Sequence, residues 1–175
     1  GKTALALNIA ENMAVDGSGV VPFFSLEMGA EQITRRRLAA KSGIYLSRIR
    51  SGNIEDSQWS ALIEAADVLA KSSLIVIDKP KYKTIENLIA MAETINMEHK
   101  ITAIFVDHIH LMTAKQKFQS RHLEISYISS EFKALAKDLA VPVIVLCQLN
   151  REVEKRKNHF HNERKVYGKA GGKIL

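Results

Sequence analysis

Three residues at the start of the chain, Gly1-Lys2-Thr3, combine a small residue, a cation and a hydroxyl. They match the last three positions of the pattern G-x-x-x-x-G-K-[ST]. In that pattern backbone N–H groups surround phosphates, the lysine reaches the β/γ oxygens and the hydroxyl ligates Mg²⁺. Because so short a match also arises by chance, the neighbouring elements have to support it. An ordinary capped helix is the alternative.

The segment TALALNIAENMAV that follows has the composition of a helix. Leu5, Ile9 and Met13 recur at the four-residue spacing of one helical face, and Gly17 lies just beyond the segment. A helix that begins at Gly1-Lys2-Thr3 would direct its unpaired N–H groups and its positive dipole end at a bound phosphate.

Polar side chains that follow apolar runs could supply the rest of a phosphate site. Asp107 comes after four apolar residues, a pattern in which the carboxylate holds the Mg²⁺ of a nucleotide. Asp78 ends another run in the same way, and a turn residue is the alternative for both. Glu27 could polarise an attacking water, or be an exposed loop residue. The amide of Gln148 could sense a γ-phosphate, or simply end a strand.

Four short apolar runs alternate with helical patterns, which indicates a parallel sheet with crossover helices. Since the runs are continuously apolar, we expect the strands to be buried on both faces. The strands are expected at 20–25, 74–78, 103–107 and 142–146, and the helices at about 30–42, 56–71, 84–99 and 122–140, with Ser57 and Thr84 as N-caps.

Two further clusters favour ordinary interpretations. His108 and His110 could point to one side of an extended segment, but two ligands make a poor zinc site. Arg35-Arg36-Arg37 lies within a helical pattern, so we expect its side chains to spread over different faces and to be solvated or paired.

Length and composition indicate one domain with a substantial core, since the chain has 175 residues and is 46% hydrophobic. No apolar run approaches the roughly 20 residues that span a bilayer, so we expect a soluble protein without a membrane partner. Cys147 is the single cysteine and cannot form an internal disulfide, which fits the reducing cytoplasm.

Much of the net charge of +6 lies at the end of the chain, where residues 151–175 hold eight Lys or Arg against three Glu. Such a tail could bind nucleic acid, but a solvated tail has the same composition. The polar and basic loop 113–121 is expected to be a mobile connection.

Four segments resemble successive motifs of the RecA-like C-terminal ATPase domain of DnaB-type replicative DNA helicases. They are GKTALALNIAENMA, FFSLEMGAEQITRRRLAA, AIFVDHIHLM and LEISYISSEFKALAKDLAVPVIVLCQLNREVEKR. The resemblance covers residues 1–156 in the family's order, and residues 157–175 form a basic tail that does not match. It implies an α/β P-loop NTPase fold with a mostly parallel sheet and helices on both faces, lacking the strand before the phosphate loop.

The resemblance also implies roles for single residues. His108 and His110 replace a usual Tyr and Gln, Cys147 replaces a Ser, and Ser130 stands where an Arg is usual. By resemblance, ATP is bound by Gly1, Lys2, Thr3 and Gln148. Lys2 would contact the β/γ-phosphates, and Gln148 would sense the γ-phosphate. Thr3 and Asp107 would bind Mg²⁺, and Glu27 would activate water.

By resemblance the chain is a fragment of a helicase that forms a hexameric ring, hydrolyses ATP and unwinds DNA by moving on single strands. Primase and a helicase loader are implied partners through an N-terminal domain. The sequence lacks the first half of the phosphate loop and the family's finger Arg, so activity of this chain alone is in doubt. The alternative is an inactive remnant that associates with helicase subunits or binds DNA non-specifically. A recombination or clock ATPase is disfavoured by the SLEM and QLNR segments.

Overall fold

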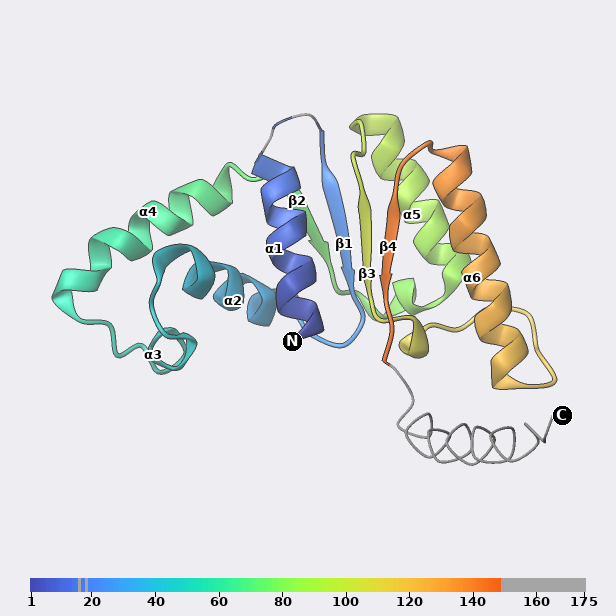
Figure 1. Ribbon diagram of the computed structural model, residues 1–175, viewed down its shortest axis with the longest axis horizontal. Coiled ribbons are helices and arrows are strands. Elements are labelled where there is room, and N and C mark those ends of the chain that lie inside the picture. Colours follow the sequence, from blue (N-terminus) through green and yellow to red (C-terminus); the bar gives the residue numbers. More distant parts are fainter. Residues whose placement is uncertain (16, 18, 149–175) are drawn as a thin grey trace, which may run out of the picture.

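A computed structural model describes residues 1–15, 17 and 19–148 of the chain (Figure 1). Its centre is a four-stranded sheet in which all neighbouring strands are parallel, as the sequence predicts. The strand order is β2-β1-β3-β4. The strands are β1 (Val21–Ser25), β2 (Leu74–Ile77), β3 (Ile104–Asp107) and β4 (Val143–Leu146).

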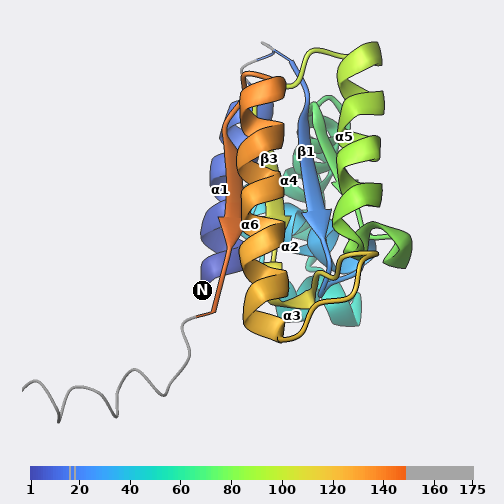
Figure 2. The same ribbon diagram turned by 90° about the vertical axis from the view of Figure 1, so that its right-hand side faces the viewer.

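Helices cover both faces of this sheet. One core cluster packs α5 and α6 against Phe24, Ile104 and Val106, and the other packs α1 and α2 against Phe23 and Phe105. Figure 2 shows α1 and α5 on opposite sides of the sheet. The helices are α1 (Lys2–Val15), α2 (Ala30–Ser42), α3 (Leu46–Ser51), α4 (Trp59–Ala70), α5 (Ile85–Glu98) and α6 (Arg121–Asp138), with short 3-10 helices η1 (Asp56–Gln58), η2 (Pro80–Lys83) and η3 (Ile109–Leu111).

Burial differs between the central strands and the outer ones. Every residue of β1 and β3 is buried, whereas β2 is buried only at its ends and β4 is half-buried throughout. The expectation of burial on both faces is therefore correct for the two central strands alone. Among the described residues, β2 and β4 each have a strand neighbour on one side only, which explains their greater exposure.

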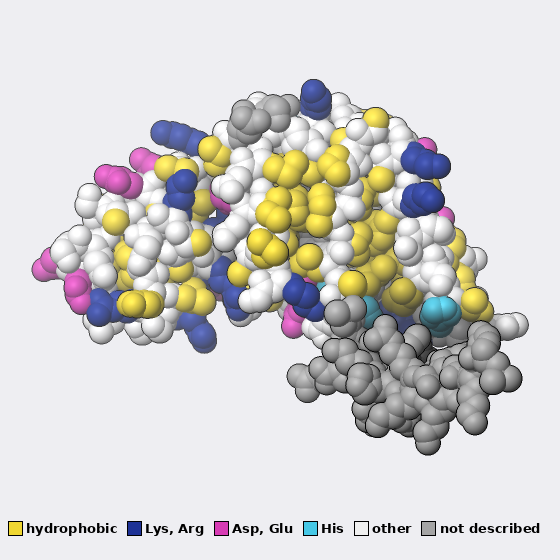
Figure 3. Space-filling model, in the orientation of Figure 1, with side chains coloured by type: hydrophobic (Ala, Val, Ile, Leu, Met, Phe, Trp, Pro, Cys, Tyr) yellow, Lys and Arg dark blue, Asp and Glu magenta, His cyan; other side chains and the backbone are white. Residues whose placement is uncertain are grey.

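The first helix is present as predicted, but its apolar stripe does not face the core. Leu5 is 65% exposed and Ile9 45% exposed, and Figure 3 shows hydrophobic side chains gathered on the surface over α1. The buried face instead carries small side chains, which let the helix backbone lie close to the stacked rings of Phe23 and Phe105. The buried residues of α1 are Ala6, Leu7, Ala10 and Ala14.

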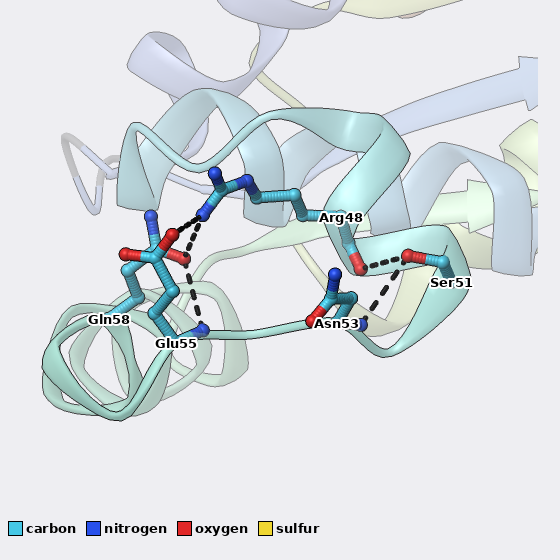
Figure 4. Close-up of polar contacts among 5 residues, drawn as sticks. All are labelled: Arg48, Ser51, Asn53, Glu55 and Gln58. Carbon is cyan, nitrogen blue, oxygen red and sulfur yellow. Dashed lines mark hydrogen bonds and ion pairs between the residues drawn. The ribbon is translucent and has the colours of Figure 1, made fainter.

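The segment between α2 and α4 contains α3, which the sequence pattern did not predict, and η1, which forms the first turn of the helix predicted at 56–71. Arg48 of α3 bonds to Glu55 and also donates to Gln58 Oε1 at 3.3 Å, while Glu55 N donates to the same oxygen at 3.3 Å (Figure 4). Ser57 lies inside η1 and is not the expected N-cap. Thr84 does occupy the N-cap position of α5, without a side-chain capping bond.

Candidate nucleotide-binding site

Residues that are far apart in the sequence meet at the carboxyl edge of the sheet. Thr3 Oγ1, in the first turn of α1, donates a hydrogen bond of 2.6 Å to Asp107 Oδ2. Asp107 is buried at the end of β3, a central strand. This contact joins two residues that are 104 positions apart in sequence. The tertiary structure therefore brings the hydroxyl and the carboxylate of the two predicted Mg²⁺ ligands together.

The lysine of the first turn lies at the end of the neighbouring strand β4. Lys2 Nζ donates a 2.8 Å hydrogen bond to the carbonyl oxygen of Cys147. Gln148 follows directly and is exposed, so its backbone lies beside the start of α1. Leu5 N donates to Gly1 O at 3.2 Å, which closes the first turn of the helix. In this arrangement the ammonium group of Lys2, although exposed, is hydrogen-bonded to the protein.

Glu27 lies in the turn that follows β1, next to the end of β3. Leu26 N donates to Asp107 O at 2.7 Å, and Ser25 Oγ donates to Met28 O at 2.6 Å. These two bonds tie the turn to the strand end that carries Asp107. The Glu27 side chain is about half exposed, so solvent can reach its carboxylate. The sequence predicts a base at this place, and the structure brings Glu27 to the same edge as Thr3 and Asp107.

His108 is a site residue whose contact the sequence did not predict. Its Nε2 lies 3.5 Å from Glu27 Oε2, while its Nδ1 is buried without a hydrogen-bond partner among the described atoms. His110 lies with its ring centroid 6.0 Å from that of His108. The described residues contain no group of three or more His, Cys, Asp or Glu that could hold a metal ion. One feature of the sequence could have indicated that His108 lies at the site: it directly follows Asp107, the predicted last residue of a strand.

Asp78 has the same sequence context as Asp107 but a different partner. Its Oδ2 accepts a 2.7 Å hydrogen bond from the backbone N–H of Ala30, the first residue of α2. A carboxylate at this position satisfies one of the unpaired N–H groups of the helix and interacts favourably with its dipole. Asp78 therefore caps α2 and is not part of the Thr3–Asp107 contact.

The groups at the edge fit a magnesium-bound nucleotide. A hydroxyl and a carboxylate oxygen are hard ligands of the kind that Mg²⁺ prefers. The first N–H groups of α1 have no partner inside the helix, and together with the Lys2 ammonium they suit phosphate oxygens. Thr3 and Asp107 could therefore hold the ion, and Lys2 with the start of α1 could hold the phosphates.

The segment after Asp107 is tied to α6. Arg121 donates to His110 O at 2.9 Å and to Met112 O at 2.7 Å, and Glu124 Oε1 accepts from Ala114 N at 3.0 Å. The N–H of Ala114 and the guanidinium of Arg121 hold the pKa of Glu124 below its ordinary value. The start and the end of loop 113–121 are therefore anchored by charged side chains.

This anchor is expected to be lost in acid. Because the pKa of Glu124 is lower in the folded chain than in the unfolded chain, its contribution to stability is complete above the unfolded value of about 4.3. It disappears as the pH falls through the folded value. The amide proton shift of Ala114, followed by NMR from pH 7 to pH 2.5, should titrate with an apparent pKa below about 4.3. Glu124→Gln should abolish this titration, and a midpoint at or above the ordinary value would contradict the assignment.

None of the helices in the described part of the chain has both the length and the apolar character needed to cross a membrane.

Comparisons with known proteins show the family to which the chain belongs. The sequence model of the DnaB-like helicase C terminal domain matches residues 1–162. The replicative DNA helicase DnaB of Buchnera aphidicola subsp. Schizaphis graminum is 43% identical over 157 residues, which cover 89% of this chain and 34% of that protein. The replicative DNA helicase DnaC of Bacillus subtilis is 38% identical over 159 residues, covering 90% and 35%. The chain therefore spans about a third of the length of these relatives.

Solved structures show the same likeness. A structure described as a DnaB-like replicative helicase and its interactions with primase superposes with a TM-score of 0.80 at 28% identity, over 89% of this chain and 38% of that one. A second solved structure, described as an ATPase domain, gives a TM-score of 0.80 at 28% identity, over 89% and 55%. Both likenesses confirm the RecA-like fold that the sequence motifs predicted.

Proposed function

Because the chain belongs to the family of DnaB-like helicase C-terminal domains, we propose that it binds ATP with Mg²⁺ at the carboxyl edge of its sheet. The whole protein would couple ATP hydrolysis to movement along single-stranded DNA and to unwinding of the duplex. The observation that carries this proposal is the 2.6 Å bond between Thr3 Oγ1 and Asp107 Oδ2 at the start of α1. It joins the two kinds of ligand that a nucleotide-bound Mg²⁺ requires.

Each residue at this edge has a distinct task in the proposal. Lys2 exchanges its bond to the Cys147 carbonyl for bonds to the β/γ-phosphates, and Gly1 lets the chain approach them closely. Thr3 and Asp107 hold Mg²⁺, which neutralises phosphate charge when it is bound. Glu27, half exposed in its turn, accepts a proton from the attacking water. Gln148 follows the carbonyl that Lys2 releases, and its amide senses the γ-phosphate.

The partners of the whole protein follow from the same proposal. One structural relative is described as an ATPase domain, and another is described with its interactions with primase. We therefore expect a hexameric ring with single-stranded DNA as substrate, and primase and a helicase loader as partners of the N-terminal domain. A cytoplasmic location fits a replication protein. Residues 157–175, the predicted basic tail, lie outside the described residues, and the division of the chain at residue 156 stays a prediction.

Removing the predicted Mg²⁺ ligand tests the site directly. Asp107→Asn keeps the size of the side chain but removes its charge, so we expect Mg²⁺ to lose its effect on ATP affinity. Titration calorimetry of the chain with ATP, with Mg²⁺ and with EDTA, measures this effect. Loss of one charged metal contact should weaken Mg-ATP binding by about tenfold or more.

Asp78→Asn is the matched control, because it alters the same residue type at another strand end. It should lower thermal stability through the weakened cap of α2 and leave the Mg²⁺ dependence of ATP binding intact. Equal losses of Mg²⁺ dependence in both variants, measured well below their melting temperatures, would count against Asp107 as the ligand.

A further inference from the structure

We propose that residues 79–83 form, together with loop 113–121, one basic surface that binds the phosphate backbone of single-stranded nucleic acid. We call it the basic rim and define it by Lys79, Lys81, Lys83, Lys115 and Lys117. It rests on the proposed function in taking DNA as the partner. It adds residues 79–83, which lie between β2 and α5, to the surface on which DNA would lie.

Backbone hydrogen bonds join the two segments of the basic rim. Thr113 N donates to Lys83 O at 2.8 Å, and Ile85 N donates to Thr113 O at 2.9 Å, so Thr84 and Thr113 form a parallel bridge. Lys115 N donates to both carboxylate oxygens of Glu86, at 3.0 and 3.2 Å. The segments run side by side beneath α5 (Figure 2). The two groups of lysines therefore belong to one surface and not to independent loops.

The charge of the basic rim is not cancelled by ion pairs. Lys79, Lys81, Lys115 and Lys117 are exposed and Lys83 is half-buried. Among the described residues, none of these lysines forms an ion pair. Their ammonium groups are therefore available to a ligand that carries several negative charges.

The carboxylates near the rim are already engaged elsewhere. Asp78 accepts from Ala30 N, Glu86 accepts from Lys115 N, and Glu124 accepts from Ala114 N and pairs with Arg121 at 2.5 Å. In the part of the chain that the structure describes, none of these carboxylates forms an ion pair with a lysine of the rim. They reduce the positive potential of the rim but do not reverse its sign.

The ordered backbone that carries the lysines suits a polyanionic ligand. Lys79, Lys81 and Lys83 alternate along the chain, and Lys81 Nζ lies 4.9 Å from the centre of the Tyr82 ring. Tyr82 is itself buried and its hydroxyl contacts Met91 Sδ at 3.2 Å, so it forms a fixed support. Because Pro80–Lys83 form a 3-10 helix, the three lysines point in different directions and do not form a row. Cations on an ordered segment still neutralise backbone phosphates without reading base identity, as in sequence-independent binding of single strands.

The basic rim begins where β2 and β3 end. Asp107 is the last residue of β3, and Thr113 follows it by six positions. The rim therefore starts at the same edge as the Thr3–Asp107 contact, on the side of the sheet covered by α5 and α6. A nucleic acid bound there would touch the segment that leads directly out of the nucleotide site.

The test compares two triple variants of the full chain with the same net charge. Lys79→Gln, Lys81→Gln and Lys83→Gln together remove charge from the rim. Lys71→Gln, Lys133→Gln and Lys137→Gln remove as much from exposed positions near the ends of α4 and α6, at the opposite edge of the sheet. Fluorescence anisotropy with a labelled 20-nucleotide oligo(dT) measures affinity as a function of salt.

The rim variant should bind about 10- to 100-fold more weakly at 0.1 M salt, and its slope of log K against log salt should fall by about 2, or 0.7 per lost contact on a single strand. The control variant should match the parent chain. Equal behaviour of the two triple variants, or no binding of oligo(dT) by the parent chain at low salt, would overturn the proposal.

Other basic segments of the chain can contribute to the total affinity for DNA. Lysine acetylation is a second readout that does not depend on that affinity, because it reports each lysine separately. Bound oligo(dT) should reduce the reactivity of Lys79, Lys81 and Lys83 towards an acetylating reagent and leave Lys71, Lys133 and Lys137 unchanged. Unchanged reactivity at the rim in a saturated complex would refute the inference. The calorimetric ATP titration of Asp107→Asn is independent of this outcome, so a failed rim and a failed nucleotide site can be told apart.

Discussion

Replacing Glu27 by Gln is expected to lower the rate of ATP hydrolysis about 10²- to 10⁴-fold, the range for loss of a general base. Gln has nearly the same shape as Glu but cannot take a proton from water. The Thr3–Asp107 contact and Lys2 do not involve Glu27, so the affinity for Mg-ATP should change less than threefold. Single-turnover hydrolysis and calorimetric binding, measured on the same preparation, separate the two effects.

Glu31→Gln is the control for this experiment. Glu31 is the next carboxylate along the chain, is 79% exposed and pairs with Arg35 on the surface of α2. Its replacement should leave both the rate and the affinity unchanged. If the parent chain hydrolyses ATP above the protein-free background and Glu27→Gln does so at the same rate, Glu27 is not the base. If the parent chain binds Mg-ATP but hydrolyses it no faster than the protein-free background, the alternative of an inactive remnant gains support.

Replacing Arg37 by Met is expected to lower the free energy of unfolding by about 3 kcal/mol. Arg37 Nε and a second guanidinium nitrogen lie 2.6 and 3.1 Å from the two carboxylate oxygens of Glu11, and the two side chains are only 9% and 15% exposed. The variant would leave the Glu11 carboxylate largely buried without its partner. A pocket of about 540 Å³ borders both residues and admits water, so the cost should lie at the low end of the range for buried pairs.

Two further variants separate burial from charge in urea unfolding. Arg35→Met removes the same charge from an exposed pair on the same helix, with side chains 42% and 79% exposed, and should cost no more than about 0.5 kcal/mol. Adding Glu11→Met to Arg37→Met removes the stranded carboxylate and should recover much of the lost stability. Equal costs for Arg35→Met and Arg37→Met would show that the Glu11–Arg37 pair is no more important than a surface pair.

These arginines illustrate what a local pattern can determine. The sequence predicts that three consecutive side chains on a helix point in different directions, because the helix advances by about 100° per residue. It does not reveal which of them meets a partner. Arg37 is buried against Glu11 only because α1 and α2 pack on the same face of the sheet. That juxtaposition joins residues 26 positions apart and depends on the fold.

The strands and their direction were predictable for a simple reason. A continuous apolar run is stable only where both faces of a strand are covered, and helical patterns between such runs require parallel crossovers. The order of the strands was not predictable, because the four runs are chemically alike. The order decides which runs become central: β1 and β3 are fully buried, and β4 stays half-buried at one side of the described sheet.

The site shows the same division between sequence and structure. The sequence alone determined the types of groups available for nucleotide chemistry: a cation and a hydroxyl at the start of a helix, and carboxylates at strand ends. The local pattern did not distinguish Asp107 from Asp78, because each is an Asp that directly follows four apolar residues. Only the family resemblance assigned Mg²⁺ binding to Asp107. The tertiary structure decided their partners, since Asp107 meets the hydroxyl of Thr3 and Asp78 meets the N–H of Ala30. Local sequence sets what a side chain can do, and packing between distant segments sets which partner it reaches.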